Sequence, residues 1–234
     1  MKRKTSLLSD LLDLISPRRC AICDDRLDAE DMLLCVQCTK ELPVTPFCES
    51  PYDNWMARLF WGQFPIEKAS AWFYFRPHSA PSHLVYDIKY HGQMEMGEMI
   101  GQLMAERHMA YGFFDGIDAI VPLPITRKRN WKRGYNQSLI VARGISMETG
   151  LPIYNDVVVR KRFTQSQTHL THFERRENIK EAFHLVKEEK IKGKHLLIID
   201  DVVTTGATVI ACGQELAKAE GVKLSVLSIA YTKE

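Results

Sequence analysis

Short apolar runs alternate with amphipathic stretches from residue 69 onward. Continuous apolar runs predict buried strands, and apolar residues spaced three and four positions apart predict helices. Strands that alternate with helices indicate an α/β fold, in which helices cover both faces of a parallel sheet. The predicted strands are residues 69–75, 118–124, 157–160, 183–186, 196–199 and 223–232, and the predicted helices are residues 82–91, 95–110, 138–150 and 207–220.

The ends of these strands carry residues of interest. Parallel sheets bind ligands at the carboxyl ends of their strands. Pro122, Arg160 and Asp200 all follow apolar runs and are expected at such ends. We therefore expect them to converge on one site.

Residues 5–16 show a different pattern. Six apolar residues, Leu7, Leu8, Leu11, Leu12, Leu14 and Ile15, predict a short amphipathic helix that stops at Pro17. Asp10 and Asp13 interrupt the run and argue against a secretory signal, and no stretch is long and apolar enough to span a bilayer. We expect the helix to pack on the body of a cytoplasmic protein without membrane insertion.

Five of the six cysteines lie within the first 48 residues. The pairs Cys20/Cys23 and Cys35/Cys38 are two C-x-x-C knuckles, the pattern of a tetrahedral Zn²⁺ site with four thiolates. Disulfides are disfavoured in a cytoplasmic chain, and a redox motif needs only one pair. Four thiolates fill all four coordination positions of the ion, so the zinc is expected to be structural. Cys48 is left over, and Cys212 reads as a small buried hydrophobe.

Composition divides the chain into three parts. Residues 1–45 are expected to form the N-terminal helix and a Cys₄ zinc-ribbon module. Residues 46–65 are rich in proline, lack periodicity and are predicted to link this module to a main domain, residues 66–234. The net charge is only +2, from 31 basic and 29 acidic residues. Any contact with nucleic acid must therefore come from a local basic patch.

The most informative segment is residues 196–208. An apolar strand leads to the adjacent acids Asp200 and Asp201, and then to a turn rich in threonine and glycine before a helix. Backbone N–H groups at a helix start favour an anion, and two carboxylates can accept hydrogen bonds from vicinal sugar hydroxyls. The pattern predicts a sugar-phosphate site. A P-loop ATPase strand looks similar, but the Gly-rich Lys-Ser/Thr loop that it requires is absent from this sequence.

Two polar segments fit an anionic ligand as well, although either is also typical of a solvated basic loop. Residues 127–137 contain five basic residues, Arg127, Lys128, Arg129, Lys132 and Arg133, interleaved with the aromatic residues Trp131 and Tyr135. This composition is also that of a patch that binds single-stranded nucleic acid. Residues 160–178 form the second segment and carry arginines, glutamines and an asparagine.

Residues 196–208 resemble the phosphoribosyl pyrophosphate (PRPP) signature of type I phosphoribosyltransferases. The wider combination resembles the ComF family of competence and gluconate-uptake proteins: a Cys₄ knuckle, residues 88–92 (Ile-Lys-Tyr-His-Gly), Pro122-Leu-Pro124, residues 133–137 and the signature. Many members carry a further C-x-x-C-G knuckle near residues 48–51, where this chain keeps only Cys48.

The resemblance implies a role for each part of the site. Asp200 and Asp201 hold the ribose hydroxyls, and the turn wraps the 5-phosphate. The loop after residues 118–122 cradles the pyrophosphate, and a mobile loop from Arg160 closes over PRPP. The implied phosphate ligands are Val203, Thr204, Thr205, Gly206, Ala207 and Thr208; the other implied contacts are Leu123, Arg133, Asn136, Gln137, Gln167 and Asn178, with Arg160 and Arg175 as catalytic cations.

Two functions follow from the resemblance. One is an enzyme of nucleoside metabolism that transfers phosphoribose from PRPP, with Mg²⁺, to a nitrogen nucleophile and releases pyrophosphate. The other is a non-catalytic accessory factor of DNA uptake that binds PRPP or single-stranded DNA and works with DNA-processing proteins. The PRPP signature is expected in both, and the acceptor base is left open.

Overall fold

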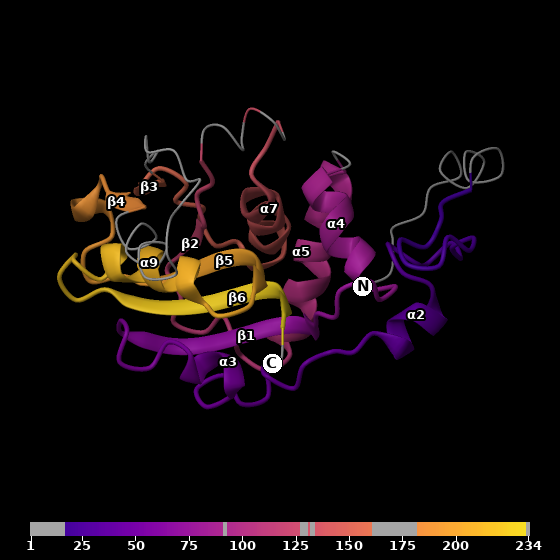
Figure 1. Ribbon diagram of the computed structural model, residues 1–234, viewed down its shortest axis with the longest axis horizontal. Coiled ribbons are helices and arrows are strands. Elements are labelled where there is room, and N and C mark those ends of the chain that lie inside the picture. The colour runs from indigo at the N-terminus through magenta and orange to yellow at the C-terminus, as the bar shows by residue number, and fades with distance from the viewer. Residues whose placement is uncertain (1–16, 91–92, 127–130, 132–133, 161–181, 233–234) are drawn as a thin grey trace, which may run out of the picture.

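A four-stranded parallel sheet forms the centre of the protein (Figure 1). The computed structural model describes residues 17–90, 93–126, 131, 134–160 and 182–232. The strands are β1 (Ile66–Tyr74), β2 (Ala119–Pro122), β5 (His195–Val203) and β6 (Lys223–Tyr231), in the spatial order β1-β6-β5-β2. All three pairings are parallel, which confirms the predicted α/β class.

Both faces of this sheet are buried. In β5, Leu196 and Ile198 pack into one apolar cluster with α9 (Ala207–Leu216), whereas Leu197 and Ile199 pack into the other with α4 (Ser82–Tyr90), α5 (Met94–Met109) and α7 (Gln137–Thr149). Successive strand residues point to opposite faces. A strand covered on both sides is therefore continuously apolar, as the sequence of 196–199 indicates.

β5 is longer than its apolar run predicts. The strand continues through the acids to Val203, because β6 stays paired with it from Asp200 opposite Ser228 to Val203 opposite Tyr231. On its other edge β5 pairs with β2 only over residues 196–199. The Ile199 carbonyl accepts the Leu123 N–H at 2.9 Å. Beyond Ile199, β2 no longer pairs with this edge of β5. The acids thus lie in a strand that is paired on one side.

The prediction that Arg160 ends a strand of the parallel sheet is wrong. β3 (Val158–Arg160) pairs antiparallel with β4 (Phe183–Leu185) in a separate two-stranded sheet. The run is short, and its burial alternates, since Val158 is buried and Val159 is 41% exposed. Such a strand suits a half-exposed hairpin rather than a sheet centre. Leu185 N–H donates to the Glu215 carboxylate of α9 at 3.2 Å, which holds the hairpin beside the main sheet.

Residues 46–65, expected as a linker, contribute to the core. The segment contains α3 (Trp55–Arg58), and the buried side chains of Met56, Phe60 and Phe64 pack with the β1 and α9 cluster. Asn54 caps α3, accepting the N–H groups of residues 56 and 57 at 3.0 Å, and its Nδ2 donates to the Ala69 carbonyl of β1 at 2.8 Å. The aromatic content of the segment, rather than any periodicity, drives this burial.

The cysteine module spans residues 17–45 of the described chain and includes α2 (Val36–Glu41). It lies at the opposite end of the molecule from the β3–β4 pair (Figure 1). Leu27, Leu33 and Leu34 are buried in the cluster that also holds Trp72 and Leu84. Among the residues that the structure describes, no helix is long and apolar enough to cross a membrane. A 3₁₀ turn, η1 (Glu188–Lys190), precedes β5.

Helices α5 and α7 cross at two glycines. A Cβ at Gly101 would overlap the Val141 carbonyl oxygen, and a Cβ at Gly144 would overlap the Glu98 carbonyl oxygen. The backbones therefore approach more closely than any other residue allows. Because α7 begins at the functional cavity described below, this contact fixes the position of its first turn.

We expect Gly101→Ala to destabilise the protein by roughly 2 kcal/mol, since overpacking a core contact costs about 1–3 kcal/mol. The sign of the change in the free energy of unfolding is informative, because Gly→Ala at an exposed helix position stabilises a protein by about 1 kcal/mol. Urea unfolding measures the effect, with Met147→Ala, at a 61% exposed position of α7, as the control. A stabilised Gly101→Ala protein would contradict this packing.

Candidate functional site

A polar cavity of about 150 Å³ opens where β2 and β5 part. Six segments that are distant in the sequence meet around it. They are the last turn of α4 (Lys89), the loop after β2 (residues 123–125), the start of α7 (Gln137 and Ser138), the end of β3 (Arg160), the acids of β5 with Val202, and Thr208 of α9. The position agrees with the rule that parallel sheets bind ligands at the carboxyl ends of their strands.

Asp200 and Asp201 stand side by side in this cavity. The Asp200 carboxylate accepts the Asp201 N–H at 2.8 Å, and the Asp201 carboxylate accepts the Val202 N–H at 2.7 Å. Burial and the neighbouring Asp201 charge raise the pKa of Asp200 to about 7, and Lys89 and Arg160 offset only part of this. At neutral pH the cavity therefore holds a carboxyl group that is only partly ionised and that gains from a hydrogen-bond donor.

Lys89 pairs with Asp201. Its Nζ lies 3.1 Å from Asp201 Oδ1, and each side chain is about one-fifth exposed. Sequence reasoning did not single out this residue as a ligand, although it noted the Ile-Lys-Tyr-His-Gly run that contains it. The available signal was a lysine two residues before the end of the predicted helix, but only the fold shows that this helix ends beside β5.

The turn after β5 leads into α9. Thr204 and Thr205 are exposed, Val203 and Gly206 are buried, and Ala207 and Thr208 are half-buried. Gly206 is the N-cap with φ 72°, and a Cβ there would lie 2.9 Å from Phe60 Cε1. Only glycine meets both conditions easily. Within the described residues no side chain caps α9, so its first N–H groups are left to bind an anion.

The loop after β2 is held by its neighbours. Asn136 Nδ2 donates to the Leu123 carbonyl at 3.0 Å, and its Oδ1 accepts the Ser138 N–H at 3.2 Å. The Tyr135 hydroxyl donates to the Ile88 carbonyl of α4. Asn136, predicted as a substrate contact, is here a cap that positions Leu123 and the first turn of α7. Gln137 is buried in the cavity wall.

Arg160 reaches the cavity from outside the main sheet. Its guanidinium carbon lies 5.2 Å from the centre of the Phe183 ring on the paired strand β4. The side chain lines the cavity with Asp200, so the predicted convergence is present even though the predicted sheet position is not. Arg133, Gln167, Arg175 and Asn178 lie outside the described residues, as do all five basic residues of 127–133. Trp131 is described and 90% exposed.

The four predicted ligand cysteines form a compact cluster. All four Sγ atoms lie within 4.8 Å of one another, and Cys23 Sγ is 3.8 Å from Cys35 Sγ. Tetrahedral bonds of about 2.3 Å to zinc give a sulfur–sulfur edge of about 3.8 Å. The N–H groups of Cys35 and Cys38 donate to Cys20 Sγ and Cys35 Sγ at 3.4 Å. The cluster can therefore hold a metal ion in the geometry of a zinc ribbon.

The other two cysteines lie elsewhere. Among the described residues, neither Cys48 nor Cys212 belongs to the metal-binding group, and both are buried. Cys212 sits in α9 within the apolar cluster, where burial raises the pKa of its thiol. This confirms its reading as a small apolar core residue.

Comparison with known proteins agrees with the geometry. The phosphoribosyl transferase domain family matches residues 90–231. The DNA utilization protein YhgH of Salmonella typhi is 31% identical over 154 residues, which cover 64% of this chain and 67% of that protein. Competence protein F of Haemophilus influenzae is 33% identical over 114 residues, 48% of this chain and 50% of that protein.

Among solved structures, glutamine PRPP amidotransferase from B. subtilis, complexed with ADP and GMP, aligns with a TM-score of 0.36 and 16% identity. The alignment covers 56% of this chain and 25% of the amidotransferase.

We expect the ligand-free Asp200→Asn protein to become more stable relative to the wild type as the pH rises. An aspartate in the unfolded chain ionises near pH 4, whereas the folded value is about 7. Between these values the folded state binds more protons, so the stability that Asp200 contributes below about pH 4 is lost as the pH rises to 7. The advantage of Asn over Asp should grow by roughly 2 kcal/mol between about pH 5 and pH 8.

Urea unfolding at the two pH values measures this difference. Glu189→Gln, at an exposed position away from the cavity, is the control. An advantage of Asp200→Asn that does not change with pH would show that the carboxyl group is not held in a desolvated, charge-paired setting.

Proposed function

The chain belongs to the phosphoribosyl transferase family, in the ComF group, and we propose that it binds PRPP with Mg²⁺ at the carboxyl end of β5 and transfers the phosphoribosyl group to a nitrogen nucleophile. The observation that carries the proposal is the partly desolvated pair of Asp200 and Asp201, followed directly by Gly206 and the uncapped start of α9. Phosphoribose carries two adjacent hydroxyls and a phosphate. The carboxyl pair would bind the hydroxyls, and the anion site that follows it along the chain would bind the phosphate.

Each part has one task in the proposed reaction. The ribose hydroxyls donate to Asp200 and Asp201, which relieves their mutual repulsion and holds the sugar. The N–H groups and hydroxyls of residues 204–208 bind the 5-phosphate. As pyrophosphate leaves, positive charge develops on the ribose, and the adjacent carboxylates stabilise it. When bound with PRPP, Mg²⁺ would supply positive charge that offsets the charge of the leaving pyrophosphate.

Lys89 and Arg160 are the cations among the described residues that line the cavity. In the proposed reaction they face the leaving pyrophosphate. Lys89 is held by Asp201 in the ligand-free protein. When a ribose hydroxyl donates to Asp201, the ammonium group becomes available to a phosphate oxygen at short range. The lysine thus serves two anions in turn without leaving the cavity.

We further propose that Cys20, Cys23, Cys35 and Cys38 hold one structural Zn²⁺. The metal would supply folding energy to the module and no chemistry, because four thiolates leave no open coordination position. Although burial opposes it, N–H donors from Cys23 and Cys35 lower the pKa of Cys20 to about 7. Burial and the neighbouring thiols raise the pKa values of Cys23 and Cys38, so metal binding would release protons from these thiols.

A second function, binding without turnover, is favoured by one observation. Trp131 is 90% exposed within the basic segment 127–133, beside the loop that borders the cavity. Exposed aromatic rings between cations are typical of surfaces that stack single-stranded bases. The relatives named for competence and DNA utilization agree with this context.

We expect Asp200→Asn and Asp201→Asn each to weaken PRPP·Mg²⁺ binding about tenfold or more. Each change keeps the side-chain shape and removes a charge-assisted hydrogen bond worth about 1.5–3 kcal/mol. Titration calorimetry with and without Mg²⁺ measures the affinity, and Asp53→Asn serves as the control.

Unchanged binding in the doubly substituted protein would refute the site. Release of pyrophosphate is then assayed with bases, amines and single-stranded DNA. If the wild type binds PRPP tightly and releases none with any acceptor, the accessory-factor function replaces the enzyme.

Metal analysis of protein purified under reducing conditions should find one zinc per chain. Cys38→Ser removes a buried ligand and should lose the zinc, whereas Cys48→Ser, also buried but outside the cluster, should retain it. Chelation should unfold the module, because zinc contributes roughly 10 kcal/mol to folding such a site, and should leave the sheet folded. Wild-type protein free of zinc, or disulfides among the four cysteines, would contradict the assignment.

A further inference from the structure

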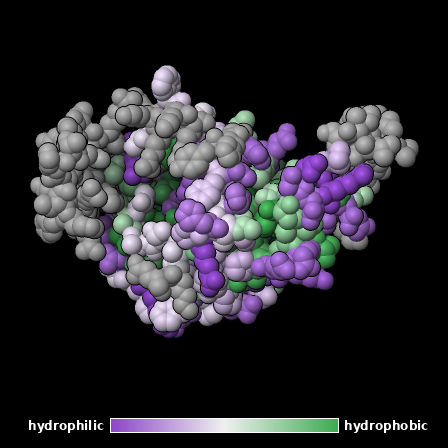
Figure 2. Space-filling view, turned by 45° about the vertical axis from the view of Figure 1, so that its right-hand side comes forward, coloured by the Kyte–Doolittle hydropathy of each residue, from purple (hydrophilic) through white to green (hydrophobic). Residues whose placement is uncertain are grey.

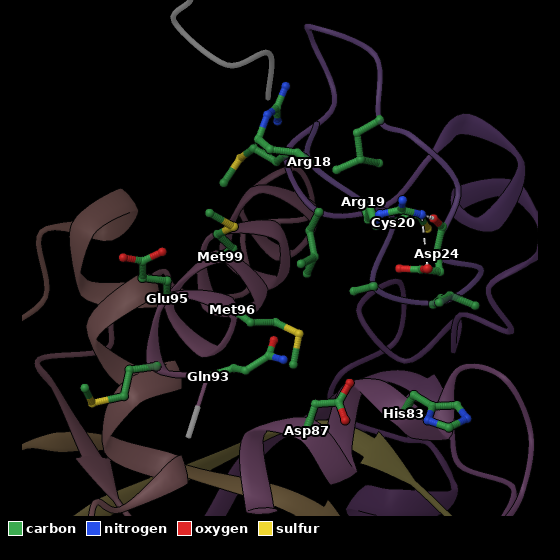
Figure 3. A pocket seen from close by; sticks show the side chains of 16 residues that line it. Arg18, Arg19, Cys20, Asp24, His83, Asp87, Gln93, Glu95, Met96 and Met99 are labelled. Carbon is green, nitrogen blue, oxygen red and sulfur yellow. Dashed lines mark hydrogen bonds and ion pairs between the residues drawn. The ribbon is translucent and has the colours of Figure 1, made fainter. Parts of the chain in front are cut away.

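A groove of about 830 Å³ separates the cysteine module from α4 and α5 (Figure 3). Met96 and Met99 project into it from α5 (Figure 3), and Leu27 and Leu33 of the module also line it. Figure 2 shows apolar surface framed by hydrophilic side chains on this side of the molecule. Methionine side chains are flexible and polarizable, and they suit the irregular surface of a docked apolar helix.

The rim of the groove carries charges. Asp87 of α4 and Glu95 of α5 lie on one side, and Arg18 lies near the other end (Figure 3). Arg18 is fixed there, since its guanidinium donates to the carbonyls of Asp28 at 3.2 Å and Ala29 at 3.3 Å. The point at which the chain enters the groove region is therefore defined.

The segment that precedes Arg18 has the matching chemistry. Residues 1–16 lie outside the described residues, but their sequence predicts an amphipathic helix with one apolar stripe at positions 7, 8, 11, 12 and 15. Twelve helical residues measure about 18 Å. Only Pro17 separates the predicted helix from Arg18, so the effective concentration of the stripe at the groove is very high. Lys2, Arg3 and Lys4 at its far end complement Asp87 and Glu95.

We propose that residues 7–15 of this chain occupy the groove with their apolar stripe against Met96 and Met99, and so join the cysteine module to α5. The leucines then cover the half-buried Met99 from solvent, and the basic residues 2–4 reach the acidic side of the rim. The helix becomes the strap that holds the module on the domain, because it contacts both walls of the groove. This inference does not depend on the function proposed for the acid pair.

Hydrogen exchange of the full-length, zinc-replete protein tests the proposal. Amides of residues 8–15 should be protected, and Leu11→Gln should reduce their protection about tenfold or more, since it removes an apolar side chain of the predicted stripe at equal helix propensity. Ser9→Gln, on the polar side of the predicted helix, is the control. In the folded part, Met99→Gln should give the same loss, and Met109→Gln, at a 50% exposed position of the same helix, should not.

Protection should be independent of protein concentration, because the occupant belongs to the same chain. Protection that rises with concentration would overturn the proposal in favour of exchange between two copies. Random-coil exchange of residues 8–15 in the wild type, or equal protection in Leu11→Gln and Ser9→Gln, would overturn it outright. Protection that appears only with anionic phospholipid vesicles would overturn it in favour of a lipid surface.

Discussion

The candidate site depends on two adjacent carboxylates that the fold keeps out of bulk water. Asp200 and Asp201 can stand there because β6 continues to pair with β5 after β2 has ended, so the strand stays rigid while one edge opens to a cavity. The arrangement is unfavourable without ligand, and Lys89 relieves only part of the repulsion. In the proposed complex two ribose hydroxyls would donate to the pair and relieve this repulsion, which would couple ligand binding to the stability of the strand end.

The rest of the molecule holds this edge in place. The close contact of Gly101 and Gly144 sets α7 against α5, and Asn136 then fixes the loop after β2 from the first turn of α7. On the other face, Phe60 leaves room for Gly206 and no other residue, so the segment 46–65 shapes the turn that leads into α9. The cavity is thus formed by contacts between segments that are far apart along the chain.

Much of this architecture can be predicted from local patterns. Strands buried on both faces have continuous apolar runs, and the acids, threonines and glycine of 200–208 stand next to each other in the sequence, so the sheet class and the core of the site were predictable. The cysteine spacing likewise predicted the cluster, since each knuckle is local. The start of α7 was predicted within one residue, and its end at Gly150 follows from a left-handed C-cap.

Other features depend on contacts that no local pattern encodes. The length of β5 is set by its partner β6, and the hairpin position of Arg160 is set by a strand more than twenty residues later. Lys89 joins the site only because α4 ends beside β5. The central claim is tested most directly by a crystal structure of the protein with PRPP and Mg²⁺. The account predicts ribose hydroxyls within hydrogen-bond distance of Asp200 and Asp201, with the 5-phosphate on the first turn of α9. PRPP bound elsewhere, with the acid pair still facing only Lys89, would contradict it.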